Sequence, residues 1–175
     1  MTRLAAIAVI VACAACGCGG AKTSPTTTVT AIGQAPAAHA ASRAELIRLS
    51  TKLGHPVYWA GGKAGDTYEL THTSDGRIYV RYLPPGVLVG ARPPLYTIVG
   101  TYPVANAPAV LRKLSKRSGE ASFAAPHGGF AVFNRAHRTN IYLAYPGSNL
   151  QIEVFDPSPN RARHLVASGR IVPVG

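Results

Sequence analysis

Cysteine is absent from the chain after residue 18, since its three cysteines are Cys13, Cys16 and Cys18. The rest of the chain therefore forms no disulfide and carries out no thiolate chemistry. The apolar run near the start, LAAIAVIVACAA, is too short to span a bilayer in the usual way. Its length is typical of the core of a signal peptide.

Acidic residues are scarce, with 7 Asp and Glu against 18 Lys and Arg, and the formal net charge is +11. This balance favours attraction to anionic surfaces such as phospholipid or acidic cell-wall polymer, and it says nothing about fold. A GC-rich genome also produces arginine-rich and alanine-rich chains, so the basic charge has a second explanation. No two carboxylates are predictably at the spacing of a glycosidase site.

Recognisable catalytic motifs are missing, including the G-x-S-x-G elbow and the H-E-x-x-H metal helix. The six histidines lack the paired spacing of a zinc site, and the glycine cluster 61–65 lacks the Gly-Lys-Ser/Thr ending of a phosphate loop, so it predicts a plain connection. We therefore expect no enzyme activity, no metal and no cofactor. A wall-directed hydrolase would need His72, His127 or Asp66 to converge in one cleft.

What the N-terminus does contain is a signal. The apolar run ends in small residues and cysteines, and this resembles the bacterial lipoprotein signal, in which a cysteine receives diacylglycerol and becomes the new N-terminus. The resemblance covers residues 1–20 and favours Cys18, with Cys16 and Cys13 as alternatives. It implies a palmitate-type anchor and export to the outer face of the cytoplasmic membrane, in the cell envelope. An ordinary cleaved signal is the other interpretation.

Residues 21–41 are rich in Thr, Ala and Pro without a helical or strand period, which predicts a disordered tether. A single globular domain is expected over residues 42–175. Ser42 and Glu45 form a capping box that predicts a helix ending at Gly54.

The stretch DTYELTHTSDGRIYVRYL, residues 66–83, predicts a β-hairpin. A three-residue loop, residues 74–76, sorts its side chains better than a two-residue loop does. That register places Glu69 opposite Arg81 and puts His72 on the apolar face with Tyr82. The apolar face is expected to be buried.

Further strands are expected at 95–102, 129–134, 141–147 and 150–157, with a helix from Asn106 to Gly119 and another opened by Ser158. IYVRYLPPG is echoed by IYLAYPG, and later matches pair Ile98 with Ile152 and Asn106 with Asn160. The predicted fold class is α+β, with antiparallel sheet from two pseudo-repeated βββα units, in halves 66–118 and 129–169, and three helices packed on one face. Chance similarity between strand-rich segments is the alternative to a repeat.

Two sets of residues are candidates for binding. The first is a group of cations for contact with an anionic surface: Arg81, Arg112, Lys113, Lys116, Arg117, Arg135, Arg138, Arg161 and Arg163. The second is a group of aromatic residues that would line a pocket between sheet and helices: Tyr58, Trp59, Tyr68 and Tyr82.

The runs HPVYW and YVRYLPPG, together with the exported and tethered layout, resemble uncharacterised bacterial lipoproteins, and that resemblance implies location only. The leading hypothesis is a non-catalytic envelope lipoprotein whose basic domain contacts anionic lipid, wall polymer or a partner protein. The alternative is a carrier of a small ligand. Export argues against nucleic acid as the partner.

Overall fold

The structure, a computed structural model, describes residues 37–92 and 95–175. Within them the elements in chain order are β1 (His39–Ala41), α1 (Arg43–Leu53), β2 (Tyr58–Trp59), β3 (Thr67–His72), β4 (Ile78–Leu83), β5 (Ile98–Pro103), α2 (Ala107–Leu114), β6 (Glu120–Ala125), β7 (Gly129–Asn134), β8 (Asn140–Ala144), β9 (Leu150–Phe155), α3 (Pro159–Ala167) and β10 (Val172–Pro173). No helix in these residues is long and apolar enough to cross a membrane.

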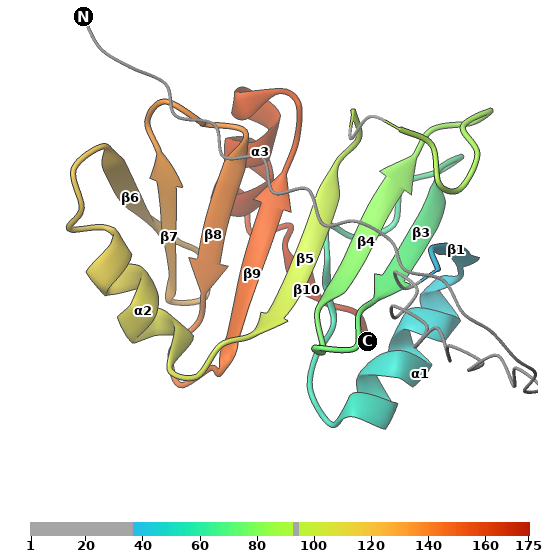
Figure 1. Cartoon of the computed structure of the whole chain (residues 1–175), viewed down its shortest axis with the longest axis horizontal. Helices are drawn as coiled ribbons and strands as arrows, with labels where there is room; N and C mark the ends of the chain where they lie inside the picture. The colour runs from blue at the N-terminus through green and yellow to red at the C-terminus, as the bar shows by residue number, and fades with distance from the viewer. Residues whose placement is uncertain (1–36, 93–94) are drawn as a thin grey trace, which may run out of the picture. The chain divides into compact units, whose positions relative to one another are not determined.

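One antiparallel sheet of eight strands dominates the fold, in the order β1-β3-β4-β5-β9-β8-β7-β6 (Figure 1). Each half of the sheet is a meander, and the two meanders meet where β5 pairs with β9 at the centre. A separate two-stranded ribbon joins β2 to β10. The α+β class with an antiparallel sheet and three helices is therefore confirmed for the described residues.

The hairpin register is confirmed. Glu69 lies opposite Arg81 and His72 opposite Ile78, so residues 74–76 form the loop tip. Gly76 has a φ of 82°, the left-handed conformation that this loop requires of its glycine. The predicted face is buried at its centre, but His72, the last residue of β3 before the turn, is exposed, so its expected place in the core is wrong.

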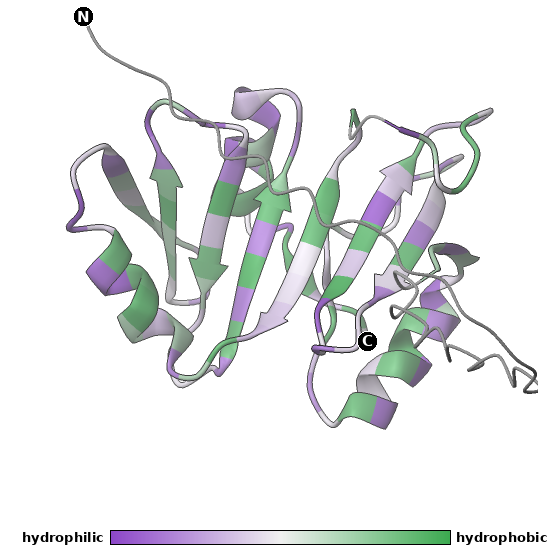
Figure 2. Ribbon diagram, viewed as in Figure 1, coloured by the Kyte–Doolittle hydropathy of each residue, from purple (hydrophilic) through white to green (hydrophobic). Residues whose placement is uncertain are grey.

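Strand alternation divides the sheet into two faces, visible in Figure 2 as alternating hydrophobic and hydrophilic bands along β9. The larger core lies on one face and combines strand residues such as Val80 and Ile152 with Leu46 of α1, Leu165 of α3 and the β2–β10 ribbon. A second, smaller core lies on the other face, where Leu111 of α2 packs on Val132 and Ala144.

The prediction that all three helices pack on one face is wrong, because α2 and α3 cover opposite faces of β8 and β9. In β8, Ile141 belongs to the core beneath α3, whereas Ala144, three residues further along the strand, packs against α2. Figure 1 shows α2 in front of the sheet and α3 behind it. The front of β4 and β5 is consequently left uncovered by any of these helices.

The matched residues of the two similar sequence segments point to the same face of the sheet in β4 and β8, but to opposite faces in β5 and β9. Tyr82 and Tyr145 both point to the larger core, as predicted. Ile98, however, pairs with Phe155 on the front face, whereas Ile152 is buried in the core behind. A slip of one residue along a strand reverses the face of every side chain, so this matching does not relate equivalent positions.

Boundaries at both ends of the domain differ from the predictions. His39–Ala41, expected within the tether, forms β1 and pairs with β3, and β10 was not predicted. α1 begins after Ser42 and ends at Gly54 as expected, but α2 ends at Leu114 rather than at Gly119. The signal, its three cysteines and the tether as far as residue 36 lie outside the described residues.

Candidate functional site

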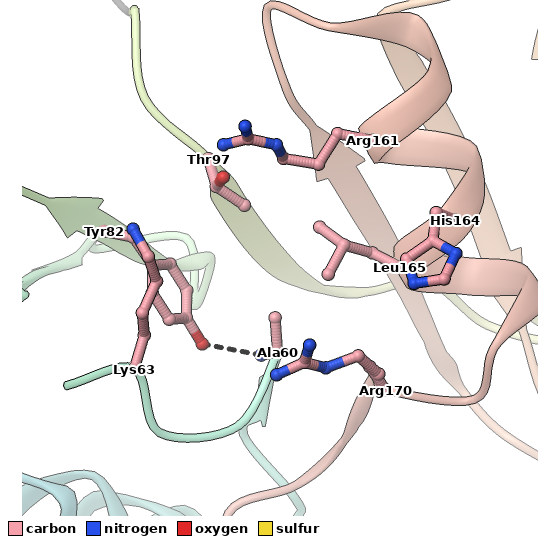
Figure 3. A pocket seen from close by; sticks show the side chains of 8 residues that line it. All are labelled: Ala60, Lys63, Tyr82, Thr97, Arg161, His164, Leu165 and Arg170. Atoms are coloured by element: carbon pink, nitrogen blue, oxygen red, sulfur yellow. Dashed lines mark hydrogen bonds between the residues drawn. The ribbon is translucent and has the colours of Figure 1, made fainter.

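A cavity of about 400 Å³ opens behind the sheet, between the loop after β2 and helix α3 (Figure 3). Its lining comes from four parts of the chain: the β2–β3 loop, β4, the start of β5, and α3 with the turn that follows it. The lining residues are Ala60, Lys63, Tyr82, Thr97, Arg161, His164, Leu165 and Arg170.

Helix α3 positions one wall of this cavity. The Ser158 hydroxyl accepts a hydrogen bond from the Arg161 backbone N–H at 3.4 Å, which fixes the start of the helix. Arg161, His164 and Leu165 are then separated by three and four residues, so they share one helical face. Gly169, at φ 72°, reverses the chain after the helix and brings Arg170 to the same cavity.

Tyr82 forms the opposite wall and is held rigidly. Its hydroxyl accepts a hydrogen bond from the Ala60 N–H at 2.6 Å and donates one to the Gly61 carbonyl at 3.1 Å. Burial raises the pKa of Tyr82 well above its ordinary value, so the hydroxyl stays neutral near pH 7. The tyrosine therefore offers an aromatic wall and contributes no charge.

The charges around the cavity are predominantly positive. Lys63 Nζ lies 2.8 Å from an Asp66 carboxylate oxygen, and Arg161 Nε lies 3.9 Å from Asp156. Arg170 has no carboxylate within ion-pair distance among the described residues. In Figure 3 the guanidinium groups of Arg161 and Arg170 both extend toward the side of the cavity that holds Tyr82.

Asp156 is the second carboxylate beside this site, and its oxygens already accept hydrogen bonds from neighbouring segments. It is 1 % exposed, accepts a hydrogen bond from the Thr97 hydroxyl at 2.6 Å and another from the Ser158 N–H at 2.8 Å. These bonds join β5 to the start of α3. Three cations face two carboxylates that are both engaged, which is an arrangement suited to binding an anion.

The predicted aromatic pocket is mostly packed core, and this corrects the sequence interpretation. Trp59 stacks edge-on against Tyr68 at 5.7 Å between ring centroids, and Tyr68 packs in the same way on Tyr82 at 5.3 Å. Tyr58 is buried against Tyr145 and borders a different groove. Of the four residues predicted, only Tyr82 lines the cavity in Figure 3, because their rings fill the space between sheet and ribbon.

The nine predicted surface cations do not form one patch. Four of them lie in the last turn of α2 and in the turn that follows it, in front of the sheet: Arg112, Lys113, Lys116 and Arg117. Arg161 and Arg163 belong to α3 behind the sheet, and Arg135 and Arg138 lie in the β7–β8 loop. Arg81 is not the surface cation that was predicted, because its side chain is only 12 % exposed and is paired with Glu69 at 2.7 Å.

The three residues on which a hydrolase would depend do not converge. His72 ends β3 and His127 lies in the turn between β6 and β7, so five strand positions separate β3 from β7. At the usual interstrand spacing this is roughly 24 Å. Asp66 is paired with Lys63, and no cluster of metal-ligating residues occurs in the described part of the chain.

Sequence reasoning did not identify Lys63 and Arg170 as members of the cavity. Lys63 lies in the glycine-rich connection and Arg170 beyond the last predicted helix, and neither has a local motif. Comparison of the chain with protein-family models, with curated proteins and with solved structures finds no match.

Proposed function

We propose that this chain is a non-catalytic lipoprotein of the cell envelope that binds a small anionic ligand in the cavity beside α3. The observation that carries the proposal is that Lys63, Arg161 and Arg170, from three separate segments, line one cavity with Tyr82 and Leu165. Cationic side chains around an apolar wall suit an organic phosphate or carboxylate better than a bare ion. The envelope location follows from the resemblance of residues 1–20 to a lipoprotein signal.

The size of the cavity favours a small ligand over a polymer. Its 400 Å³ lies at the lower end of the range for small-molecule sites. Arg161 and Arg170 can each donate two parallel hydrogen bonds to phosphate or carboxylate oxygens, whereas Lys63 contributes a point charge. A wall polymer or lipid would have to present a single phosphate or carboxylate group to use this site.

Calorimetric titration of the full chain with glycerol 3-phosphate, and separately with glycerol, tests the proposal. We expect heat of binding for the phosphate ester only. Arg170→Gln should weaken that binding by at least tenfold, because charge-assisted hydrogen bonds each contribute about 1.5–3 kcal/mol.

Arg117→Gln is the matched control, since it removes the same charge from the turn after α2, on the other face of the sheet. It should leave the affinity unchanged apart from a small long-range effect. Equal weakening by the two variants would mean that the ligand responds to net charge alone and would contradict a defined site, as would the absence of binding.

The basic cluster at the end of α2 and in the turn after it supports a second candidate function, contact with anionic lipid or wall polymer. Arg112, Lys113, Lys116 and Arg117 follow one another within six residues, and the first turn of α2 has no acidic residue. Such a cluster near a membrane surface contributes about 1 kcal/mol for each cation. Removing all four charges should weaken binding to anionic vesicles and flatten its salt dependence, whereas removing Arg170 should change neither.

We further propose that the meanders β3–β4–β5 and β7–β8–β9 arose by duplication, a narrower form of the predicted βββα repeat. Ile78 and Ile141 both point into the larger core, and so do Tyr82 and Tyr145, which supports the proposal. The proposed duplication does not include the helices, because α2 and α3 pack on opposite faces of the sheet. Alignment of the two meanders in related sequences should strengthen the β4–β8 match while leaving α2 and α3 dissimilar.

A further inference from the structure

The loop between β4 and β5 holds most of the exposed apolar side chains of the described residues. Leu88 is 80 % exposed, Leu95 57 % and Val89 37 %, and the fourth large exposed hydrophobic residue is Val110 of α2. Figure 2 shows the hydrophobic colour on this loop, beyond the end of β4. Single exposed apolar residues are ordinary, but a cluster on one loop marks an interaction site.

Residues 84–91 of this loop have a defined backbone. Val87 N–H bonds the Pro84 carbonyl at 3.1 Å, and Ala91 N–H bonds the Leu88 carbonyl at 3.1 Å, which makes two successive turns. Gly86 and Gly90, the third residues of these turns, both have φ of 82°, as turns of this kind require. Leu88 and Val89 are thereby presented away from the sheet on an ordered loop.

A buried ion pair fixes the base of the loop. One carboxylate oxygen of Glu69 accepts hydrogen bonds from the Arg81 guanidinium at 2.7 Å and from the Gly90 N–H at 2.6 Å. Arg81 also donates to the Ala91 carbonyl at 2.8 Å. Burying two charges is costly unless they are paired and hydrogen-bonded. Glu69 and the two terminal nitrogens of Arg81 make these bonds, whereas Arg81 Nε is buried without a partner among the described residues. The pair therefore favours the conformation of residues 84–91 that supplies the Gly90 N–H and the Ala91 carbonyl.

We propose that Leu88 and Val89 insert into the interfacial region of a phospholipid bilayer and orient the domain on the membrane. The loop tip is small compared with the roughly 800 Å² that each partner buries in a stable protein interface, whereas two apolar side chains suffice for a contact with lipid. Arg92, exposed beside the tip, and the net charge of +11 complement anionic headgroups. The proposal rests on the membrane location proposed above but not on the anion cavity.

The test uses Leu88→Trp in the full chain reconstituted into vesicles of phosphatidylglycerol and phosphatidylcholine, with brominated lipid as a contact quencher. The natural Trp59 is 6 % exposed within the core and gives a constant background. Tryptophan at position 88 should be quenched at least twofold more than the background and should emit at shorter wavelength than in detergent-free buffer.

Val110→Trp is the matched control, because Val110 is also an exposed apolar residue, 43 % exposed, but lies on α2. It should show quenching no greater than that of the natural protein if the loop makes the contact, whereas contact through the basic cluster at α2 would quench position 110 instead of position 88 and would overturn the proposal. Equal quenching at positions 88 and 110, or none at position 88, would overturn the proposal. Titration of the same variants with glycerol 3-phosphate reports the anion cavity separately, so failure of one proposal is distinguishable from failure of the other.

Discussion

The ring of Tyr102 lies over Gly100, its neighbour two residues back on the front face of β5. A Cβ atom added to Gly100 would lie only 2.6 Å from the Tyr102 hydroxyl oxygen. Gly100 is paired with Tyr79 on one side and with Glu153 on the other. The missing side chain therefore leaves room for Tyr102 to donate a hydrogen bond to Glu153 and to pack edge-on against Tyr79 at 5.5 Å.

Gly100→Ala should displace Tyr102 and destabilise the domain by about 1 kcal/mol. The added methyl group occupies the space of the hydroxyl, so the bond to Glu153 is lost, and a typical hydrogen bond contributes about that much. The loss is limited because Tyr102 is only half-buried and can rotate outward. Chemical denaturation of the natural chain and the variant measures the difference.

Tyr102→Ala provides the background in which this clash cannot occur. There Gly100→Ala should become neutral or stabilising by about 0.5 kcal/mol, since alanine restricts the unfolded chain more than glycine does. The double variant should therefore lose less stability than the sum of the losses caused by Gly100→Ala and Tyr102→Ala alone. If Gly100→Ala costs the same in both backgrounds, contact with Tyr102 is not the reason for glycine at this position.

Alkaline solution should destabilise the domain, beginning above pH 10. Burial raises the pKa of Tyr82 and Tyr102, and for Tyr102 the hydrogen bond to Glu153 and its negative charge raise it further. Between the ordinary tyrosine pKa of about 10 and the raised folded value, the unfolded state binds fewer protons, so stability falls as pH rises. Below pH 10 these tyrosines leave stability independent of pH.

Absorbance at 295 nm follows tyrosine ionisation in this range. Glu153→Gln should lower the pKa of Tyr102 by removing the neighbouring charge. Tyr102→Phe should remove one of the tyrosine ionisations that occur at the highest pH. A natural protein whose eight tyrosines all titrate near pH 10 while it is still folded would contradict the burial described here.

Local signals were sufficient where the structure is decided within a few residues. Asp75-Gly76 with alternating flanks predicted the hairpin register, and Ser42 with Gly54 predicted both ends of α1. The side of the sheet on which α2 packs was not predictable, because it depends on whether the strand before it ends on an inward or an outward residue. Pro103 and Pro157 look equivalent in sequence, yet Pro103 is the last residue of β5 and Pro157 follows β9.

The binding cavity was harder to predict than the fold. Its cations come from positions 63, 161 and 170, which only the packing of α3 against the ribbon and sheet brings together. Aromatic residues were a misleading guide, since Tyr58, Trp59 and Tyr68 are large enough to fill the core themselves. The pairing of Glu69 with Arg81 was predictable from the register, but its burial depends on the loop around Gly90, which is 21 residues after Glu69.

Removing one member of the buried ion pair should be costly. Glu69→Ala leaves the Arg81 charge buried and the Gly90 N–H without its acceptor, and such a change destabilises proteins by about 3–5 kcal/mol. The double variant Glu69→Ala with Arg81→Met should lose less than Glu69→Ala alone. Arg77→Ala is the control, since its partner Asp75 is exposed and that pair should contribute little. Thermal unfolding ranks the three variants, and a Glu69→Ala protein as stable as Arg77→Ala would contradict the role of the pair.

The residues before α2 and α3 should respond to substitution in different ways. The Ser158 hydroxyl caps α3, so Ser158→Ala should destabilise the domain by about 1 kcal/mol. Asn106 makes no side-chain hydrogen bond to α2 and has a φ of 50°, in the left-handed region. Asn106 therefore stabilises the start of α2 because asparagine tolerates the left-handed backbone conformation.

Asn106→Gly should consequently be neutral or slightly stabilising, whereas Asn106→Ala should cost about 1 kcal/mol because alanine is strained at positive φ. At Ser158, Ser158→Gly should cost only a few tenths of a kcal/mol, since glycine is nearly as good a cap as serine, and Ser158→Ala about 1 kcal/mol, since alanine loses the hydrogen bond. Urea denaturation of the four variants measures these costs. A larger cost for Asn106→Gly than for Asn106→Ala would show that the asparagine side chain, rather than its backbone, is what α2 requires.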